Sequence, residues 1–202
     1  MSGDHYFSAQ PATDLRQKAI RVAIAGREVE VTTAGGVFSP DRLDAGTRVL
    51  LDTVPAPPPG GDLLDLGCGW GPIALSLALE SPHATVWAVD VNERSLDLTR
   101  RNAERLGLVN VNAVRPEDVP TGIEFATIWS NPPIRVGKAE LHGMLSRWLP
   151  ALAPGSDAWL VVQKNLGADS LQRWLEAELS GHAIVRADTA RGYRVLRARR
   201  RG

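Results

Sequence analysis

The residues best suited to chemistry gather in a glycine-rich loop and in an asparagine followed by two prolines. The loop covers residues 65–71, and the second motif is Asn131-Pro132-Pro133-Ile134. Alternate glycines remove Cβ atoms, so the backbone can turn tightly and approach a ligand closely. A dinucleotide-binding loop counted from Gly67 needs a glycine at position 72, where this chain has Pro72. The loop therefore predicts a nucleotide-like ligand without a pyrophosphate.

Acidic residues follow the glycine loop along the chain. Asp90 ends the next expected strand, 25 residues after Asp65, and a carboxylate there can accept hydrogen bonds from both hydroxyls of a ribose. Glu117 and Asp118 follow the third expected strand, and one of them can bind the exocyclic amine of adenine. We prefer Asp118 for this role, although the turn can place either residue.

The Asn131-Pro132-Pro133-Ile134 motif is suited to an amino group. The amine of a nucleobase or an amide is a poor nucleophile because its lone pair is delocalised into the π system. The side-chain carbonyl of Asn131 and the backbone carbonyl of Pro132 can each accept one N–H, which aims the lone pair at an electrophilic carbon. Positioning of this kind can supply several kcal/mol, at best about 7–11 kcal/mol. We therefore predict that these four residues form the catalytic motif.

Strands and helices alternate along most of the chain. Strands are expected at residues 62–66, 84–89, 109–114, 125–129, 158–162, 182–187 and 193–198, and helices at residues 72–80, 92–106, 138–149 and 168–179. Two short strands at residues 20–25 and 28–33 and a helix at residues 41–54 precede them, and a proline-rich connection follows. The order predicts an α/β fold: a Rossmann-like, seven-stranded, mostly parallel sheet with helices on both faces.

One domain is expected over residues 1–202, with an N-terminal hairpin and helix in residues 1–54 and the core in residues 62–198. Each motif falls just after a strand, and ligands of such sheets bind beyond the carboxyl ends of the strands. Hydrophobic residues make up 44% of the chain, as in ordinary globular proteins, and the formal net charge is zero. A strongly basic nucleic-acid-binding protein would have a positive net charge, although local positive patches can still form on a neutral protein.

The cysteine, the histidines and the apolar runs of the chain bear on its location and on metal binding. The single cysteine, Cys68, cannot form an internal disulfide, and the four histidines lack the spacing of metal ligands. The start of the chain shows no signal peptide, and no apolar run approaches the roughly 20 residues that span a bilayer. We therefore expect a cytoplasmic protein without a metal or a membrane partner.

The glycine loop, Asp90 and Asp118 resemble the ligand loops of class I S-adenosylmethionine-dependent methyltransferases. The resemblance implies that they hold, in turn, the methionine part, the ribose and the adenine of S-adenosylmethionine. The cofactor residues implied within these loops and the second motif are Asp65, Gly67, Cys68, Gly69, Gly71, Asp90, Val91, Asp118 and Asn131.

The second motif resembles the branch of this fold that methylates amino groups: adenine N6, guanine N2 and protein glutamine N5. Its fourth residue is usually aromatic and stacks on the target. Here Ile134 removes that stacking, so apolar packing must serve, which weakens the adenine N6 reading in particular.

Residues 36–51, residues 131–138 and residues 192–196 resemble the small-subunit ribosomal RNA guanine-N2 methyltransferases and their short, single-domain relatives with a "methyltransferase small" domain. The resemblance implies that Phe38, Asp44 and Thr47 lie near the cofactor or over the target pocket, and we assign Phe38 and Thr47 to the cofactor and Phe38 also to the substrate. Arg135 and Lys138 follow the second motif beside the expected target pocket, where they can bind phosphates that flank a splayed-out base. The resemblance also implies ribosomal RNA or the small ribosomal subunit as the partner. Better-known members carry a second, degenerate domain before the catalytic one, for which this chain has no room.

Sequence analysis therefore predicts an S-adenosylmethionine-dependent N-methyltransferase that acts on guanine N2 of 16S ribosomal RNA. Two alternative enzymes stay open, a protein glutamine N5 methyltransferase and an adenine N6 methyltransferase. A third alternative is a non-catalytic, cofactor-binding ribosome-assembly factor. The intact Asn131-Pro132 pair argues against the third alternative.

Overall fold

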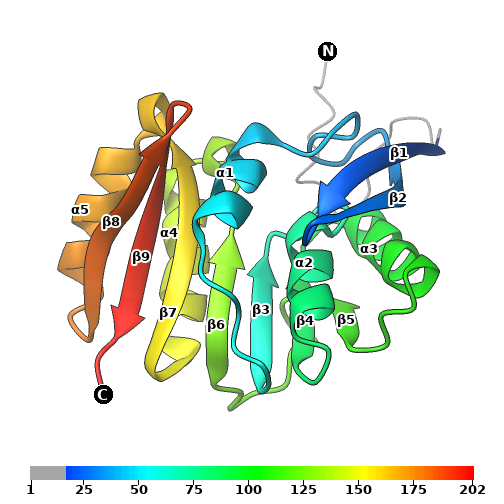
Figure 1. The fold of residues 1–202 in the computed structure, drawn as a ribbon. Helices are drawn as coiled ribbons and strands as arrows, with labels where there is room; N and C mark the ends of the chain where they lie inside the picture. The colour runs from blue at the N-terminus through cyan, green and yellow to red at the C-terminus, as the bar shows by residue number, and fades with distance from the viewer. Residues whose placement is uncertain (1–16) are drawn as a thin grey trace.

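A computed structural model describes residues 17–202, with the side chain of Arg135 outside the described part (Figure 1). The chain begins with the antiparallel hairpin of β1 (Gln17–Ile24) and β2 (Arg27–Ala34). Helix α1 (Ala45–Thr53) follows and starts four residues later than the sequence predicts. The reason is a cap: the Asp44 carboxylate accepts hydrogen bonds from the backbone N–H groups of Gly46 and Thr47, which fixes the first turn.

The core is one seven-stranded sheet in the order β5-β4-β3-β6-β7-β9-β8. Its strands are β3 (Asp62–Leu66), β4 (Thr85–Val89), β5 (Val111–Val114), β6 (Phe125–Ser130), β7 (Leu152–Gln163), β8 (His182–Ala190) and β9 (Tyr193–Arg200). β3 to β7 pair in parallel, and β9 runs antiparallel to both β7 and β8. The predicted seven-stranded, mostly parallel sheet is confirmed.

Strand β7 begins at Leu152, six residues before its predicted start. Leu152 pairs with Phe125, and the register then shifts so that Asp157 pairs with Thr127. The irregular stretch between these two pairs contains Pro154 and Gly155, which hide the strand from a reading based on alternation of apolar residues.

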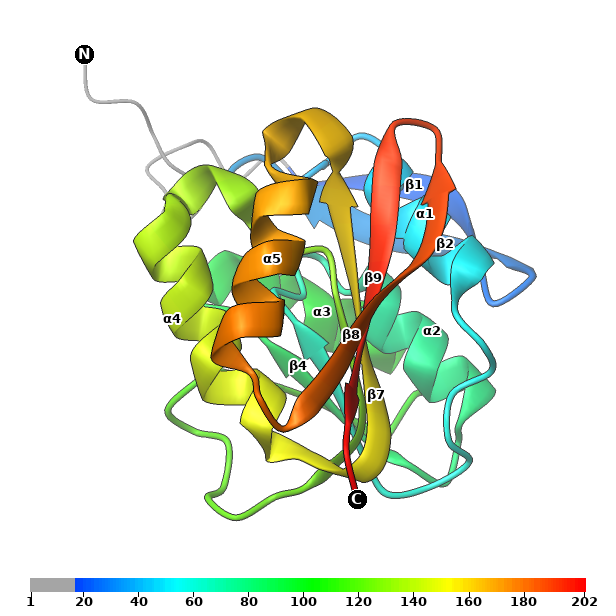
Figure 2. The same ribbon diagram turned by 90° about the vertical axis from the view of Figure 1, so that its left-hand side faces the viewer.

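Helices cover both faces of the sheet, as Figure 2 shows. Helices α4 (Lys138–Trp148) and α5 (Ala168–Glu178) pack on one face, and α1, α2 (Pro72–Glu80) and α3 (Glu93–Arg105) pack on the other. Short 3-10 turns lie at Ile134–Val136 (η1), Leu149–Ala151 (η2) and Lys164–Leu166 (η3). In the part of the chain that the structure describes, no helix is both long and apolar enough to cross a bilayer.

The sheet reverses its strand order between β3 and β6. From β3 the chain moves outward through β4 and β5, and it then returns to β6 on the other side of β3. The loops that leave the carboxyl ends of β3 and β6 therefore diverge and open a crevice, which is where such sheets bind ligands. Both predicted motifs lie at this point, because the glycine loop follows β3 and Asn131 follows β6.

The N-terminal hairpin packs over α2 and α3 (Figure 1). Val22, Ile24 and Val31 of the hairpin share a buried apolar cluster with Leu75 of α2 and Leu98 of α3. Burial of this cluster fixes the hairpin beside the glycine loop, so the segment that connects β2 to α1 passes directly over the predicted ligand site.

Candidate active site

The glycines of the loop have positive φ angles, which residues with a side chain rarely adopt. Gly67, Gly69 and Gly71 have φ angles of 81°, 57° and 99°. A Cβ on Gly71 would lie 3.0 Å from the Thr99 side chain, whereas a Cβ on Gly69 would meet no atom within 4 Å. Gly71 is therefore required by packing inside the protein, and Gly69 leaves open space on the ligand side.

Four N–H groups of this loop, those of Gly67, Cys68, Gly69 and Gly71, are bound within the protein. Gly67 and Cys68 donate to the Val89 carbonyl, at 2.8 and 3.0 Å, and Gly71 donates to the Cys68 carbonyl. Gly69 donates to Oδ2 of Asp90 at 3.0 Å. A phosphate-binding loop directs such donors at its anion. Their internal use agrees with Pro72 in excluding a pyrophosphate.

Two buried carboxyl groups, Asp65 and Asp90, lie at the loop. Asp65 is fully buried; its Oδ2 accepts a hydrogen bond from Ala74 N at 2.9 Å, and its Oδ1 has no partner among the described residues. Burial raises the pKa of Asp65 to about 8, and it also raises the pKa of Asp90. Burial, followed by the charges of Asp90 and Asp65, raises the pKa of Cys68 far above its usual value. Cys68 is therefore a protonated, small residue and not a nucleophile. A cationic ligand at the loop would favour the ionised form of both carboxyl groups.

Hydrogen bonds fasten the β2–α1 connection to the glycine loop. Asn92 donates from its amide to the Gly36 carbonyl at 2.9 Å, and the Trp70 indole donates to the Ser39 carbonyl at 3.2 Å. These two bonds hold residues 35–44 as a roof over the loop.

Asn102 ties the hairpin to the same loop from below. It is fully buried, accepts from Thr32 N at 2.7 Å, and donates to the carbonyls of Thr32 and Trp70 at 3.0 and 2.9 Å. These three bonds use both N–H groups and one lone pair of the amide, so Asn102 links the hairpin directly to the glycine loop.

The roof and the two motifs enclose one pocket. Its lining combines the roof, the start of α1, the glycine loop and the start of α2 with the end of β6: Phe38, Ser39, Asp44, Thr47, Gly67, Cys68, Gly69, Trp70, Pro72, Ile73 and Asn131. The structure thus brings together six of the predicted site residues, Phe38, Thr47, Gly67, Cys68, Gly69 and Asn131. Asp65 is buried beneath the loop, and Asp90, Val91 and Asp118 lie further along the carboxyl edge of the sheet.

Asn131 has a fixed side-chain orientation. Its Nδ2 donates to Oδ2 of Asp44 at 2.9 Å and to Oγ1 of Thr47 at 3.0 Å. A carboxylate only accepts hydrogen bonds, so the amide end that faces Asp44 must be the NH₂ group. Both amide hydrogens are then used, and Oδ1 is left as the acceptor that Asn131 can offer to a ligand.

The rest of the motif is held by backbone geometry. Ser130 Oγ donates to the Leu66 carbonyl at 2.6 Å and joins the ends of β6 and β3. Pro133 has φ −74° and ψ 78°, an inverse γ-turn in which Ile134 N donates to the Pro132 carbonyl at 2.9 Å. One lone pair of the Pro132 carbonyl remains for a ligand. Ile134 packs against the apolar cluster beneath α4 and α5.

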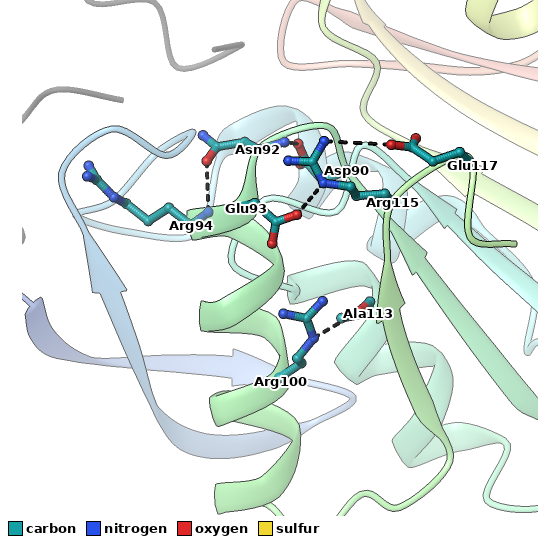
Figure 3. A network of polar contacts seen from close by, with 8 residues as sticks. All are labelled: Asp90, Asn92, Glu93, Arg94, Arg100, Ala113, Arg115 and Glu117. Atoms are coloured by element: carbon teal, nitrogen blue, oxygen red, sulfur yellow. Dashed lines mark hydrogen bonds and ion pairs between the residues drawn. The ribbon is translucent and has the colours of Figure 1, made fainter. Parts of the chain in front are cut away.

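The acids after β5 have different partners. Figure 3 shows Arg115 between Glu93 and Glu117, with both of which it forms ion pairs. Asp118 is exposed, and within the described residues its carboxylate has no such partner. This difference favours Asp118 over Glu117 for a ligand amine, as the sequence-based prediction prefers.

Sequence reasoning missed the buried polar residues that carry the loop. Ser130, Thr99 and Asn102 each hold a backbone group at the site, and Thr99 Oγ1 donates to the Gly69 carbonyl at 3.0 Å. A signal was present: Ser95, Thr99 and Asn102 follow each other by four and three residues along the buried side of α3. Polar side chains on an otherwise apolar stripe indicate fixed internal partners.

The predicted substrate residues lie at the rim of the site. Lys138 is the exposed first residue of α4, while the Arg135 side chain falls outside the described part. Among the residues that the structure describes, no group of histidine, cysteine or acidic side chains is arranged to hold a metal ion.

Comparison with known proteins identifies the family. The methyltransferase small domain matches residues 28–197. Uncharacterized protein YbxB of Bacillus subtilis is 34% identical over 200 residues, which cover 98% of each chain. The ribosomal RNA small subunit methyltransferase C of Pseudomonas aeruginosa (strain LESB58) is 31% identical, over 95% of this chain and 57% of that protein.

A solved structure agrees with these matches. It is the T. thermophilus 16S rRNA N2 G1207 methyltransferase (RsmC) in complex with AdoMet and guanosine, with a TM-score of 0.78 and 26% identity over 95% of this chain and 52% of that one. The chain thus spans about half the length of the ribosomal RNA methyltransferases it matches.

These matches confirm the predicted class I methyltransferase fold and S-adenosylmethionine as its cofactor. The features of the pocket fit that cofactor. A sulfonium cation favours ionisation of the two buried carboxyl groups, and the N–H donors of Gly67, Cys68, Gly69 and Gly71 are bound inside the protein and not directed at an anion. The chain belongs to the methyltransferase small domain family of S-adenosylmethionine-dependent methyltransferases.

Proposed function

We propose that this methyltransferase transfers a methyl group to the exocyclic N2 amine of guanine in 16S ribosomal RNA. The observation that carries the proposal is the orientation of Asn131, whose NH₂ group is bound by Asp44 and Thr47. An amine target needs an acceptor at this position, and the orientation leaves the Oδ1 acceptor free to take that role. With the opposite orientation, Asn131 would present donors to the target amine.

The residues of the second motif can act together on one amine. Asn131 Oδ1 accepts one N–H, and the remaining lone pair of the Pro132 carbonyl accepts the other. Two acceptors pull the nitrogen toward tetrahedral geometry, and its lone pair then points along the line of displacement. When bound, S-adenosylmethionine supplies an electrophilic methyl group. A strong base is unnecessary, because the nitrogen becomes acidic once it is methylated.

The cofactor residues divide along the carboxyl edge of the sheet. Gly67 and Gly69 let the ligand approach the backbone, and the positive charge of the ligand favours ionisation of the two buried carboxyl groups. Asp90 lies at the end of β4, where it is to bind the ribose hydroxyls. Val91 is 47% exposed beside it and offers an apolar surface to the adenine, whose amine is assigned to Asp118.

The choice of guanine in RNA rests on the relatives. The T. thermophilus relative was solved with AdoMet and guanosine and is described as acting on N2 of G1207 in 16S rRNA. Its likeness covers nearly the whole of this chain, including the pocket. Ile134 lacks the aromatic ring that stacks on adenine in N6-specific relatives, which favours guanine over adenine.

Mass mapping of ribosomal RNA nucleosides from cells with and without the gene tests the proposal. We expect N2-methylguanosine at one position to disappear in the deletion strain, to return with the wild-type gene, and to stay absent with Asn131→Ala. Cofactor affinity of purified Asn131→Ala, measured by calorimetry, should match that of the wild type. Loss of a methylated glutamine from a protein, with unchanged RNA, would assign the enzyme to glutamine N5 instead.

A further inference from the structure

The cations on the target side of the pocket lack internal partners. Arg48, Lys138, Lys164 and Arg191 make no side-chain hydrogen bond or ion pair within the described part of the chain. Lys138, Lys164 and Arg191 are exposed, and Arg48 is partly exposed. A side chain that is neither paired nor buried keeps its full charge available for an external anion.

Many other cations of the described structure are engaged. The pairs are Arg101–Asp97, Arg105–Glu30, Arg115–Glu93, Arg186–Asp169, Arg194–Asp169, Arg197–Asp157, Arg199–Asp157 and Arg200–Glu124. Asp169, the acid at the start of α5, is among them and is shared by two arginines, so it offsets no charge of the four unpaired cations. A net charge of zero for the whole chain is therefore compatible with four cations that keep their charge for an external partner, although Asp52 of α1 and Glu140 of α4 are exposed acids of the same helices.

The four cations lie on segments that are joined to one another and to the catalytic asparagine. Lys164 N donates to the Gly192 carbonyl at 2.8 Å, which joins η3 to the tight Arg191-Gly192 turn between β8 and β9. A Cβ on Gly46 would lie 2.8 Å from the Tyr193 ring, so the start of α1 packs directly on the end of the same turn.

The start of α1 and the start of α4 are both close to Asn131 along the chain or through a hydrogen bond. Thr47, which precedes Arg48, accepts a hydrogen bond from Asn131. Lys138 begins α4, seven residues after Asn131 on the same side of the sheet as α5. Figure 2 shows the starts of α4 and α5, the β8–β9 turn and α1 at the same end of the molecule.

The opposite side of the pocket is built for the cofactor. There Arg115 is bound by Glu93 and Glu117, and Asp90 follows the end of β4 (Figure 3). Asp118 lies in the loop after β5. A polyanion would be repelled by these acids and attracted by the four unpaired cations. The charge distribution therefore favours binding of a polyanion across α4, η3, the β8–β9 turn and α1.

We infer that Arg48, Lys138, Lys164 and Arg191 form a track for the phosphate backbone of the single-stranded RNA that carries the target base. This inference rests on the proposed function, because it takes RNA as the acceptor. The track holds the strand on the far side of Asn131 from the cofactor, and a splayed-out base then enters beside Asn131. The cations bind phosphates and not bases, so they contribute affinity without choosing the sequence.

The test compares two variants of equal charge. In the track variant Arg48, Lys138, Lys164 and Arg191 are all replaced by Gln. In the control variant Arg21, Arg27, Arg173 and Arg201 are replaced by Gln; these cations are also exposed and unpaired within the described residues, but they lie on the hairpin, the outer side of α5 and the C-terminus. Both variants reach a net charge four units below that of the wild type.

Binding of a fluorescein-labelled, 30-nucleotide, mixed-sequence single-stranded RNA is measured by anisotropy at several KCl concentrations. Four lost phosphate contacts should reduce the slope of log K against log salt by about 3, because each contact to a single strand contributes about 0.7. We expect the track variant to lose at least tenfold in affinity near 100 mM KCl and the control variant to keep the wild-type slope within about 1. Calorimetry should give all three proteins the same affinity for S-adenosylmethionine, and thermal melting should show that all are folded.

Equal losses in the two variants, or no loss in the track variant, would overturn the track. If RNA methylation were present at the same time, the proposed function would survive that result. A wild-type protein that binds cofactor but neither binds nor methylates RNA would overturn both proposals. Displacement of the RNA by a polyglutamate peptide at a lower concentration than by unlabelled RNA would assign the surface to an acidic protein and equally overturn the track.

Discussion

Replacement of Asp65 by Asn should change how the stability of the protein depends on pH. Burial raises the pKa of Asp65 from an ordinary 3.8 to about 8 in the folded protein. The unfolded chain therefore releases this proton near pH 4, while the folded chain keeps it until about pH 8. The contribution of Asp65 to the free energy of unfolding is fully present below pH 4 and is lost as the pH rises toward 8.

The size of this loss follows from the difference between the two pKa values. Each unit corresponds to about 1.4 kcal/mol, so the wild type should lose about 4 kcal/mol from this one group between pH 5 and pH 8. An asparagine in place of Asp65 cannot ionise, and its side-chain carbonyl can still accept the hydrogen bond from Ala74 N. The Asp65→Asn protein should therefore gain about 4 kcal/mol relative to the wild type over the same range.

Urea unfolding of both proteins at pH 5, 6.5 and 8 measures the effect. The difference between the two proteins cancels the titration of all groups that they share. Bound S-adenosylmethionine should flatten the wild-type slope, because its positive charge favours the ionised carboxyl. Parallel stability profiles for the two proteins, to within about 1 kcal/mol, would refute the reasoning and show that Asp65 is ionised at neutral pH despite its burial.

Three further predictions concern the pocket and its support. Thr47→Val removes one of the two acceptors that orient Asn131, so kcat should fall about threefold to tenfold, the effect of one hydrogen bond of about 0.5–1.5 kcal/mol, and by a larger factor than the calorimetric affinity for cofactor; a loss of cofactor affinity with unchanged kcat would contradict an orienting role. Asp90→Ala should weaken S-adenosylmethionine binding at least tenfold, or about 1.4 kcal/mol, in the same titration, and unchanged affinity would show that the ribose lies elsewhere. Asn102→Leu leaves the backbone groups of Thr32 and Trp70 unpaired and should lower the free energy of unfolding by about 3 kcal/mol in urea; a loss below about 1 kcal/mol would mean that water replaces the amide.

The fold was predictable because its signals are local. Apolar runs of strand length alternate with helical patterns, and glycine or proline marks most boundaries, so all the strands of the main sheet and the four core helices were expected near their observed positions. The two clear differences have separate causes. The start of α1 is set by the Asp44 cap, which is local and was not predicted, whereas the first half of β7 depends on the distant pairing of Leu152 with Phe125 across a register shift.

The residues of the pocket were predictable from the sequence, but the hydrogen bonds that connect them to distant segments were not. The spacing of the glycines and the Asn131-Pro132 pair indicate what they bind, because those residue types have few other uses in that order. Nothing in the spacing shows that Asn102 joins Thr32 to Trp70, 70 and 32 residues away along the chain. Such bonds depend on which helix faces which strand, and that is settled only when the hairpin packs on α3.

Asp44 joins the folding of α1 to the chemistry at Asn131. One carboxylate oxygen, Oδ2, accepts hydrogen bonds from Gly46 N, Thr47 N and Asn131 Nδ2. The first two bonds start the helix, and the third decides which end of the Asn131 amide faces the target. If α1 is displaced, Asn131 loses both Asp44 and Thr47 and can turn its donors toward the pocket, where they oppose an amine. In the proposed mechanism the N-terminal segment therefore helps to set the catalytic geometry, even though every predicted catalytic residue follows β6 along the chain.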